Sequence, residues 1–148
     1  METVFPVNGV RLGIASAGIK KVGRKDLVII ELAPGTATAA VFTRNDFCAA
    51  PVVLARQHLS QVAPRYLMIN TGNANAGTGE SGLLAASATV RALAERVGCA
   101  EEEVLPFSTG VIGEPLPVDK LVAAQAPALA DLHEDHWQTA AEGIMTTD

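Results

Sequence analysis

The hydrophobic positions along this chain alternate between short apolar runs and longer stretches with helical spacing, and this pattern predicts a mixed α/β fold. Apolar runs that are rich in Val, Ile, Phe or Tyr and bounded by Gly, Pro, Asn or Asp predict strands. The predicted strands cover residues 26–32, 38–43, 65–70 and 104–107. The break Ala33-Pro34-Gly35 separates the first two, so we expect these two strands to pair in antiparallel fashion.

Helices are expected where a proline can begin the first turn, or where small and apolar residues recur every three or four positions. The predicted helices cover residues 51–60, 80–97, 117–125 and 131–143. Pro51 suits the first turn of one helix, Gly98 suits the C-terminal cap of the next, and Pro127 is expected to end the third. Residues 4–14 predict an extended segment with a tight Asn8-Gly9 turn. A β-hairpin around this turn is an alternative that the sequence does not decide.

The chain is long and apolar enough to bury a real core. It has 148 residues, of which 49% are hydrophobic, and we expect residues 1–148 to form a single α/β domain. Two cysteines are too few for a disulfide scaffold, and the N-terminus has no signal-peptide pattern, so a reducing, cytoplasmic location is expected. No apolar run reaches the length of a membrane span.

The charge distribution argues against nucleic acid and anionic membranes as partners. Sixteen acidic and eleven basic residues give a net charge of −5, which repels both kinds of surface. The only local positive cluster consists of Lys20, Lys21, Arg24 and Lys25, and it has no helical or aromatic pattern suited to nucleic acid. We therefore interpret the cluster as a solvated loop and expect a small molecule as the ligand.

A strand tip near residue 110 has the residue types that can hold a developing negative charge. The apolar run 104–107 leads into Ser108-Thr109-Gly110, which predicts a turn, and the chain continues as Val111-Ile112-Gly113. Without a strand partner, the amides around Gly110 and the Thr109 hydroxyl would become convergent hydrogen-bond donors. The same residues also favour turns for purely local reasons, so an ordinary turn stays open at this point.

A loop rich in Gly and Asn follows the strand 65–70. Gly77, Gly79 and Gly82 match the spacing of a dinucleotide-binding loop, and a nucleotide-binding α/β module that uses this loop is the alternative function. The match is poor, because six residues separate the strand from Gly77 and no acidic residue follows the next strand. The amides of Asn70, Asn73 and Asn75 could instead bind a carboxylate or satisfy one another.

The sequence predicts no metal site. His133-Glu134-Asp135-His136 has one residue between its Glu and the second His, whereas the zinc-protease pattern requires two. A solvated helix start is the interpretation that we prefer. Cys48 and Cys99 have no acid or base nearby in the sequence, so we expect two small buried hydrophobic residues rather than nucleophiles.

Four segments of the chain are informative in combination. They are residues 39–43 (Ala-Ala-Val-Phe-Thr), 70–76 (Asn-Thr-Gly-Asn-Ala-Asn-Ala), 107–117 (Phe-Ser-Thr-Gly-Val-Ile-Gly-Glu-Pro-Leu-Pro) and 143–148 (Gly-Ile-Met-Thr-Thr-Asp). Together they resemble the glutamate N-acetyltransferase family, also called ornithine acetyltransferase. Their order and spacing match the N-terminal part of that family. The resemblance implies a layered α/β sandwich whose sheets are completed by a second chain.

The resemblance also implies an activity and its residues. In the family, a precursor cleaves itself before a threonine into an α and a β chain, which assemble as (αβ)₂. The freed threonine carries an acetyl group from N²-acetyl-L-ornithine to L-glutamate in arginine biosynthesis. The oxyanion hole maps to Thr109 and Gly110, and a substrate-binding threonine maps to Thr146 or Thr147. No cofactor is implied, and the use of acetyl-CoA as a second acetyl donor is left open.

One difference from the family concerns the end of the sequence. The family continues beyond Met-Thr-Thr-Asp, whereas this sequence stops at Asp148. The nucleophilic threonine, a lysine shortly before it and a later glutamate are therefore expected outside these residues. We expect the sequence to represent most of an α chain, which would be inactive without the β chain.

Overall fold

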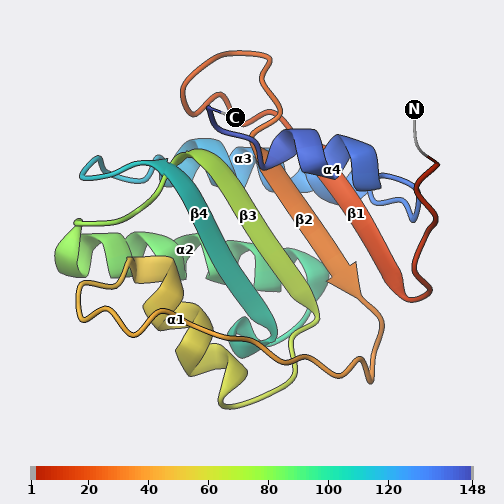
Figure 1. The fold of residues 1–148 in the computed structure, drawn as a ribbon, viewed down its shortest axis with the longest axis horizontal. Coiled ribbons are helices and arrows are strands. Elements are labelled where there is room, and N and C mark those ends of the chain that lie inside the picture. Colours follow the sequence, from red (N-terminus) through yellow and green to blue (C-terminus); the bar gives the residue numbers. More distant parts are fainter. Residues whose placement is uncertain (1–2, 148) are drawn as a thin grey trace.

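A four-stranded sheet with the strand order β1-β2-β3-β4 forms the centre of the fold (Figure 1). The computed structural model describes residues 3–147, so Asp148 at the end of the Met-Thr-Thr-Asp motif lies outside the described residues. The strands are β1 (Val10–Ala15), β2 (Leu27–Leu32), β3 (Tyr66–Asn73) and β4 (Val104–Val111). The pairs β1/β2 and β2/β3 are antiparallel, while β4 runs parallel to β3.

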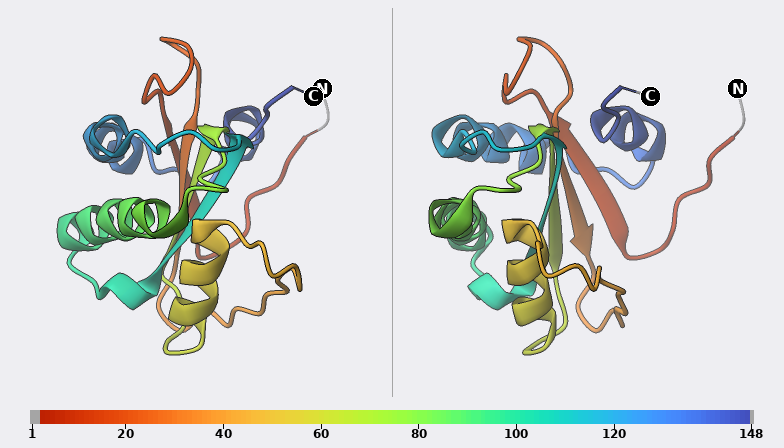
Figure 2. Two further views of the ribbon diagram at one scale, coloured as in Figure 1. Left: turned by 90° about the vertical axis from the view of Figure 1, so that its left-hand side faces the viewer. Right: turned by 60° about the vertical axis from the view of Figure 1, so that its left-hand side comes forward.

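Helices cover the two faces of this sheet unequally (Figure 2). Two long helices, α2 (Gly79–Val97) and α3 (Val118–Ala130), lie on one face, and α1 (Ala50–Leu59) packs beside β4 against the same core. The short α4 (Trp137–Gly143) lies on the opposite face over β1 and β2. A single 3₁₀ turn, Glu101–Glu103, precedes β4. The layered α/β arrangement predicted from the sequence is confirmed.

Local signals placed the first two helices correctly. Pro51 stands in the first turn of α1, where its missing N–H costs nothing. Gly98 ends α2 in the left-handed conformation with φ of 74°, and its N–H donates to the Ala94 carbonyl. Among residues 3–147, we find no helix with the length and hydrophobicity needed to cross a membrane.

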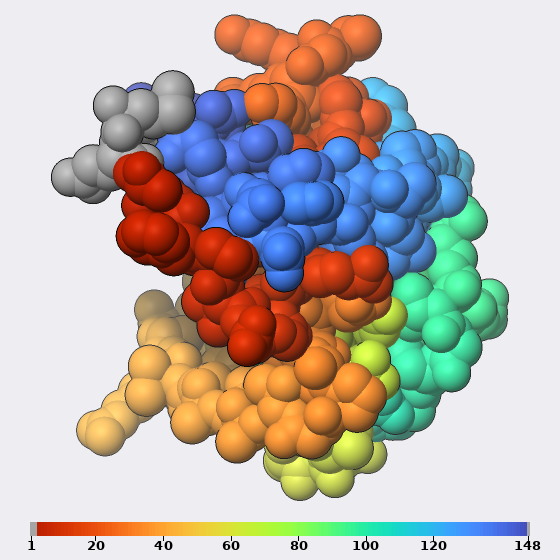
Figure 3. All heavy atoms as spheres, turned by 90° about the vertical axis from the view of Figure 1, so that its right-hand side faces the viewer, coloured from red at the N-terminus to blue at the C-terminus, as the bar shows by residue number. Residues whose placement is uncertain are grey.

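The predicted strand at residues 38–43 is wrong, and so is its pairing with residues 26–32. Both edges of β2 are already occupied, because Val10–Ala15 pairs with one edge and β3 with the other. Residues 38–43 therefore run as an irregular surface segment, with Val41 almost fully exposed. Figure 3 shows this segment, in yellow-orange, projecting from the body of the molecule. The β-hairpin that the sequence left undecided around Asn8-Gly9 does not form. The turn there leads into β1, which pairs with β2.

The last two helices begin or end differently from the prediction. Helix α3 continues past Pro127, and its buried Ala128 packs so closely on β1 that a Cβ at Gly13 would lie 1.9 Å from the Ala128 oxygen. This packing outweighs the helix-ending tendency of proline. Helix α4 begins only at Trp137, because His133 and Leu12 exchange two backbone hydrogen bonds of 3.0 Å.

Candidate functional site

The segment Ser108-Thr109-Gly110 is the second half of strand β4, so the turn predicted there is wrong. Its three residues pair with Asn70, Thr71 and Gly72 of the parallel strand β3. The pairing with β3 overrides the local preference of Ser, Thr and Gly for turns, because a ladder partner satisfies backbone groups that a turn would leave exposed.

One edge of β4 is nevertheless free of a strand partner in the described residues, because β4 is the last strand of the sheet. The Val111 carbonyl accepts a hydrogen bond of 2.8 Å from the Ala74 N–H, so the Val111 peptide groups face β3. In a regular strand, backbone groups of successive residues point to opposite sides, so we expect the Gly110 N–H to face the open edge, close to the Thr109 hydroxyl.

The identity of residue 110 is fixed by its contact with Gly72. Gly110 has a φ of +134°, a backbone conformation that residues with a side chain rarely adopt. A Cβ at this position would lie 2.4 Å from the Gly72 carbonyl carbon and 2.6 Å from the Asn73 nitrogen. Glycine is therefore required for β3 and β4 to approach each other at this point.

A pocket of about 380 Å³ lies at the carboxyl ends of β3 and β4. It is lined by Lys20, Arg24, Gly72, Thr109, Gly110, Val111, Thr146 and Thr147. The pocket thus contains Thr109 and Gly110 together with both candidates for the substrate-binding threonine, Thr146 and Thr147, although these residues come from distant parts of the chain. Figure 1 shows the loop after β1 and the C-terminal segment meeting near these strand ends. The roles of the four residues stay predictions.

Hydrogen bonds from two side chains hold the C-terminal segment against the strand ends. The buried Thr71 hydroxyl of β3 donates to the carbonyl of Gly143, the last residue of α4, at 3.1 Å. The Arg24 guanidinium donates through Nη2 to the carbonyls of Met145 and Thr146, the latter at 2.9 Å. These contacts place the backbone of residues 143–146 beside the pocket.

The loop that carries the basic cluster was interpreted from the sequence as a solvated loop. This interpretation is wrong for two of its residues. Lys20 and Arg24 both line the pocket, and Lys20 forms an ion pair with Glu114. Sequence reasoning missed them because the fold, rather than any local pattern, brings this loop to β4. The signal that could have found them is Asp26, an acidic residue at the start of a predicted buried strand.

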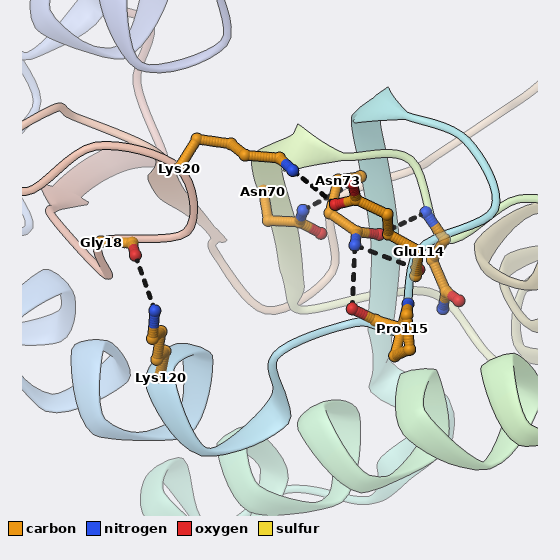
Figure 4. A network of polar contacts seen from close by, with 8 residues as sticks. Gly18, Lys20, Asn70, Asn73, Glu114, Pro115 and Lys120 are labelled. Atoms are coloured by element: carbon orange, nitrogen blue, oxygen red, sulfur yellow. Dashed lines mark hydrogen bonds and ion pairs between the residues drawn. The ribbon is translucent and has the colours of Figure 1, made fainter.

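Asp26 organises this loop. It is 2% exposed, and its carboxylate accepts hydrogen bonds from the N–H groups of Ala17 at 2.6 Å and Ile19 at 2.9 Å. From the other side, the Lys120 ammonium of α3 donates to the Gly18 carbonyl at 3.1 Å (Figure 4). Charge-assisted hydrogen bonds of this kind fix a loop more firmly than neutral ones.

Three asparagines at the end of β3 and just after it, Asn70, Asn73 and Asn75, satisfy one another and nearby backbone groups, which was one of the two alternatives. Asn70 donates to the Asn73 carbonyl at 2.9 Å, and Asn73 donates to the carbonyls of Glu114 and Pro115 at 3.2 and 3.0 Å (Figure 4). Asn75 donates to Gly82 at 2.9 Å. All three side chains are buried, so this network is structural and ties the chain after β4 to the end of β3.

The Gly77–Gly82 loop lacks the features of a phosphate cradle. A cavity of about 780 Å³ does lie beside Gly77 and Gly79, but the charged residues of its lining are Asp46 and Glu80, which would repel phosphate. At Gly82, a Cβ would lie 1.8 Å from the Thr78 hydroxyl oxygen. The last glycine of the pattern is therefore needed for packing the first turn of α2.

The histidines and cysteines form no metal centre in the described part of the chain. Within residues 3–147, no three His, Cys, Asp or Glu side chains come together in a way that could hold a metal ion. The His133 and His136 ring centroids are 5.1 Å apart, ahead of α4. Burial, together with the charge of Glu103, raises the pKa of the Cys99 thiol, which makes a thiolate nucleophile less accessible.

Comparison with known proteins agrees with the resemblance. Residues 11–148 match the model of the ArgJ family. Over all 148 residues, the chain is 59% identical to the arginine biosynthesis bifunctional protein ArgJ of Pseudomonas fluorescens. It is also 59% identical over 143 residues, 97% of the chain, to the protein of the same name from Methylococcus capsulatus.

Two solved structures share the fold. The ornithine acetyltransferase of Mycobacterium tuberculosis, crystallised with ornithine, matches 97% of this chain with a TM-score of 0.91 and 39% identity, over 78% of its own chain. The ArgJ protein of Bacillus halodurans matches 95% of this chain with a TM-score of 0.78 and 32% identity, over 74% of its own chain. The chain spans only 36% of the Pseudomonas fluorescens relative and 35% of the Methylococcus capsulatus relative. The family match nevertheless covers nearly every residue from β1 onward, and the chain belongs to the ArgJ family.

Proposed function

We propose that this chain supplies the oxyanion-binding side of an acetyltransferase that moves an acetyl group from N²-acetyl-L-ornithine to L-glutamate in arginine biosynthesis. The observation that carries the proposal is the single pocket that contains Thr109 and Gly110 together with Thr146 and Thr147. Family membership and the name of the Mycobacterium tuberculosis neighbour, an ornithine acetyltransferase, support the same reaction class.

The proposed reaction proceeds in two acyl-transfer steps. A threonine hydroxyl from the part of the protein beyond this chain attacks the acetyl carbonyl, and the Thr109 hydroxyl and the Gly110 N–H hold the oxyanion that forms. Collapse of this intermediate expels ornithine as the free amine and leaves acetyl-threonine on the enzyme. The amine of glutamate then attacks the ester, passes through a second oxyanion at the same donors, and leaves as N-acetylglutamate.

We place the nucleophile in a second chain produced by self-cleavage, with an (αβ)₂ assembly. The lengths of the relatives support this division. The present chain covers 78% of the solved Mycobacterium tuberculosis chain but 36% of a curated relative, so the solved chain is much shorter than that relative. The proposed exchange needs no cofactor, acetyl-CoA is a second candidate donor, and the cytoplasmic location remains a prediction from the sequence.

The test is a transfer assay on the complete protein that carries this chain. Purified enzyme is incubated with N²-acetyl-L-ornithine labelled in the acetyl group, first alone and then with L-glutamate. We expect intact-mass measurements to show an acetylated β chain in the first incubation, and label to appear in N-acetylglutamate in the second. A protein that transfers no label to glutamate, or that binds adenine nucleotides tightly instead, would refute the proposed function.

A further inference from the structure

The charged side chains that line the pocket are both basic. Lys20 and Arg24 line it together with Thr109, Thr146 and Thr147, in a chain whose net charge is −5. Two cations on the wall of a pocket in an otherwise acidic protein favour an anionic ligand. A volume of about 380 Å³ is in the range of pockets that bind small molecules.

Lys20 is held over the end of the strand pair by its own loop. A Cβ at Gly72, which lies opposite Gly110, would be 3.2 Å from the Lys20 Cγ and 3.1 Å from the Ile19 Cγ2. The aliphatic stem of Lys20 therefore lies against β3 at Gly72, the residue that pairs with the candidate oxyanion donor Gly110. Because Asp26 anchors the N–H of Ile19, the next residue in the chain also has a defined position.

The present partner of Lys20 is a carboxylate that does not line the pocket. Lys20 Nζ forms an ion pair with Glu114, and Figure 4 shows the lysine reaching from its loop across to this residue. The side chains are 37% and 49% exposed, and ion pairs with this much exposure contribute little to stability. The Glu114 backbone is held separately, through its carbonyl, by Asn73. The Glu114 side chain can thus leave Lys20 without disturbing β4.

Arg24 is less suited to the same task. Its Nη2 already donates to the carbonyls of Met145 and Thr146, so its position is tied to that segment. Lys20, with three donors on a flexible stem and one exposed partner, can accept a second carboxylate with little rearrangement.

We propose that Lys20 binds the carboxylate of the amino-acid substrate in the Thr109–Gly110 pocket, and that this carboxylate replaces Glu114 as the partner of the lysine. The assignment rests on the proposed function, because it identifies the recognition group for the substrates of that reaction. Both N²-acetyl-L-ornithine and L-glutamate carry a carboxylate next to the reacting nitrogen. Fixing this group would bring the acetyl carbonyl toward the donors of β4.

The experiment compares N²-acetyl-L-ornithine with its carboxamide in the complete protein. The wild-type enzyme is expected to prefer the acid in kcat/KM. In Lys20→Met, the value for the acid should fall by roughly tenfold to a hundredfold, the range for removing a hydrogen bond to a charged group, while the value for the amide stays near wild type. Lys20→Arg should restore part of the preference. Lys21→Met is the matched control, because this adjacent exposed lysine does not line the pocket.

A second variant tests the exchange of carboxylates. Glu114→Gln removes the competitor and should tighten binding of the acid by up to about fivefold, the factor that corresponds to an exposed ion pair. An unchanged or weaker affinity in this variant would overturn the exchange. A Lys20→Met enzyme that keeps the wild-type preference for the acid would overturn the assignment of Lys20.

Failure of the proposed function can be told apart from failure of this assignment. A wild-type protein that transfers no acetyl group would refute the proposed reaction. Whether Lys20 binds a carboxylate in the pocket is then tested without turnover. The acid and the amide are then compared by equilibrium binding to wild type, Lys20→Met and Lys21→Met. Loss of the preference in Lys20→Met alone would support the carboxylate site, and equal preferences in all three proteins would refute it.

Discussion

Gly110 lies directly opposite Gly72 in the parallel pair of β3 and β4, and the two backbones are too close there to admit a side chain. We expect Gly110→Ala to destabilise the protein by roughly 2–5 kcal/mol, because both the positive φ and the 2.4 Å approach to Gly72 become strained. Urea unfolding measures this loss. Gly113→Ala is the control, since Gly113 also has a positive φ but a Cβ there would meet no atom within 4 Å, and it should lose only about 1–2 kcal/mol. Equal losses in both variants would contradict the argument from close approach.

The Thr109 hydroxyl should matter for turnover more than for binding. Removing one oxyanion donor typically lowers kcat by about 10²–10³, and we expect this effect for Thr109→Ala in the complete enzyme, with KM less affected. Self-cleavage should slow as well if it passes through a similar oxyanion. Thr109→Ser keeps a hydroxyl and serves as the control. A kcat for Thr109→Ala within about threefold of wild type would exclude the assigned role.

The Asn73 side chain should be essential for the stability of the strand ends. It is 2% exposed, donates to two carbonyls and accepts from the Asn75 N–H at 2.7 Å. Asn73→Ala leaves these groups without a partner, and each unsatisfied buried group costs about 1–3 kcal/mol. We expect a loss of about 3 kcal/mol or more in chemical denaturation. Asn45→Ala is the matched control, because the exposed Asn45 accepts a single hydrogen bond from Phe47; a comparable loss there would refute the special role of burial.

The sequence predicted those elements whose signals are local. Pro51 and Gly98 mark the ends of α1 and α2, and the apolar run of β2 leaves little choice but a buried strand. The prediction from the sequence failed where strand pairing decides the structure. Residues 38–43 have the composition of a strand but find no free edge, whereas Ser108-Thr109-Gly110 has the composition of a turn but finds one on β3.

The candidate site, too, was predicted only in part, because some of its residues carry a recognisable motif and others are brought there by the fold. The family resemblance pointed to Thr109, Gly110 and one of Thr146 and Thr147, but no pattern in the sequence connects them to Lys20 or Arg24. Those two residues reach the pocket because the buried Asp26 folds their loop back over β3. Such a contact depends on the whole sheet being formed, and the local pattern of the basic cluster could only predict a solvated loop.

Tyr66 gives a prediction for alkaline pH. Burial raises the pKa of its phenol to about 12, aided by the hydrogen bond of 3.0 Å that the hydroxyl donates to Glu31. A pKa raised above the usual value of about 10 means that the folded state favours the protonated phenol. Stability from this group is therefore complete below about pH 10 and is lost as the pH rises toward 12.

Because Tyr66 is the only tyrosine among residues 1–148, its ionisation can be followed by ultraviolet absorbance as the difference between wild type and Tyr66→Phe. We expect the free energy of unfolding to decrease from about pH 10 to 12 in wild type, and the decrease to be smaller in Tyr66→Phe. A tyrosine that titrates near pH 10 in the folded protein would contradict the burial argument.

The last prediction concerns residues 1–148 expressed alone. Within the described part of the chain, no helix covers β3 and β4 on the face that carries α4 (Figure 1), and Phe107 of β4 is 39% exposed. Other large apolar side chains near the strand ends and the C-terminal segment are also exposed, namely Val111, Ile112, Ile144 and Met145. We expect the isolated segment to bind a hydrophobic dye and to transfer no acetyl group, because an exposed apolar surface of this kind favours a protein partner.

Co-expression with the remainder of the protein should reduce dye binding and restore turnover together, since the proposed second chain provides both the cover and the nucleophile. The matched control is co-expression with the same remainder carrying Ala in place of its nucleophilic threonine, which should remove turnover without increasing dye binding. A monodisperse, cooperatively unfolding segment that catalyses the exchange by itself would contradict the division of labour proposed for the two chains.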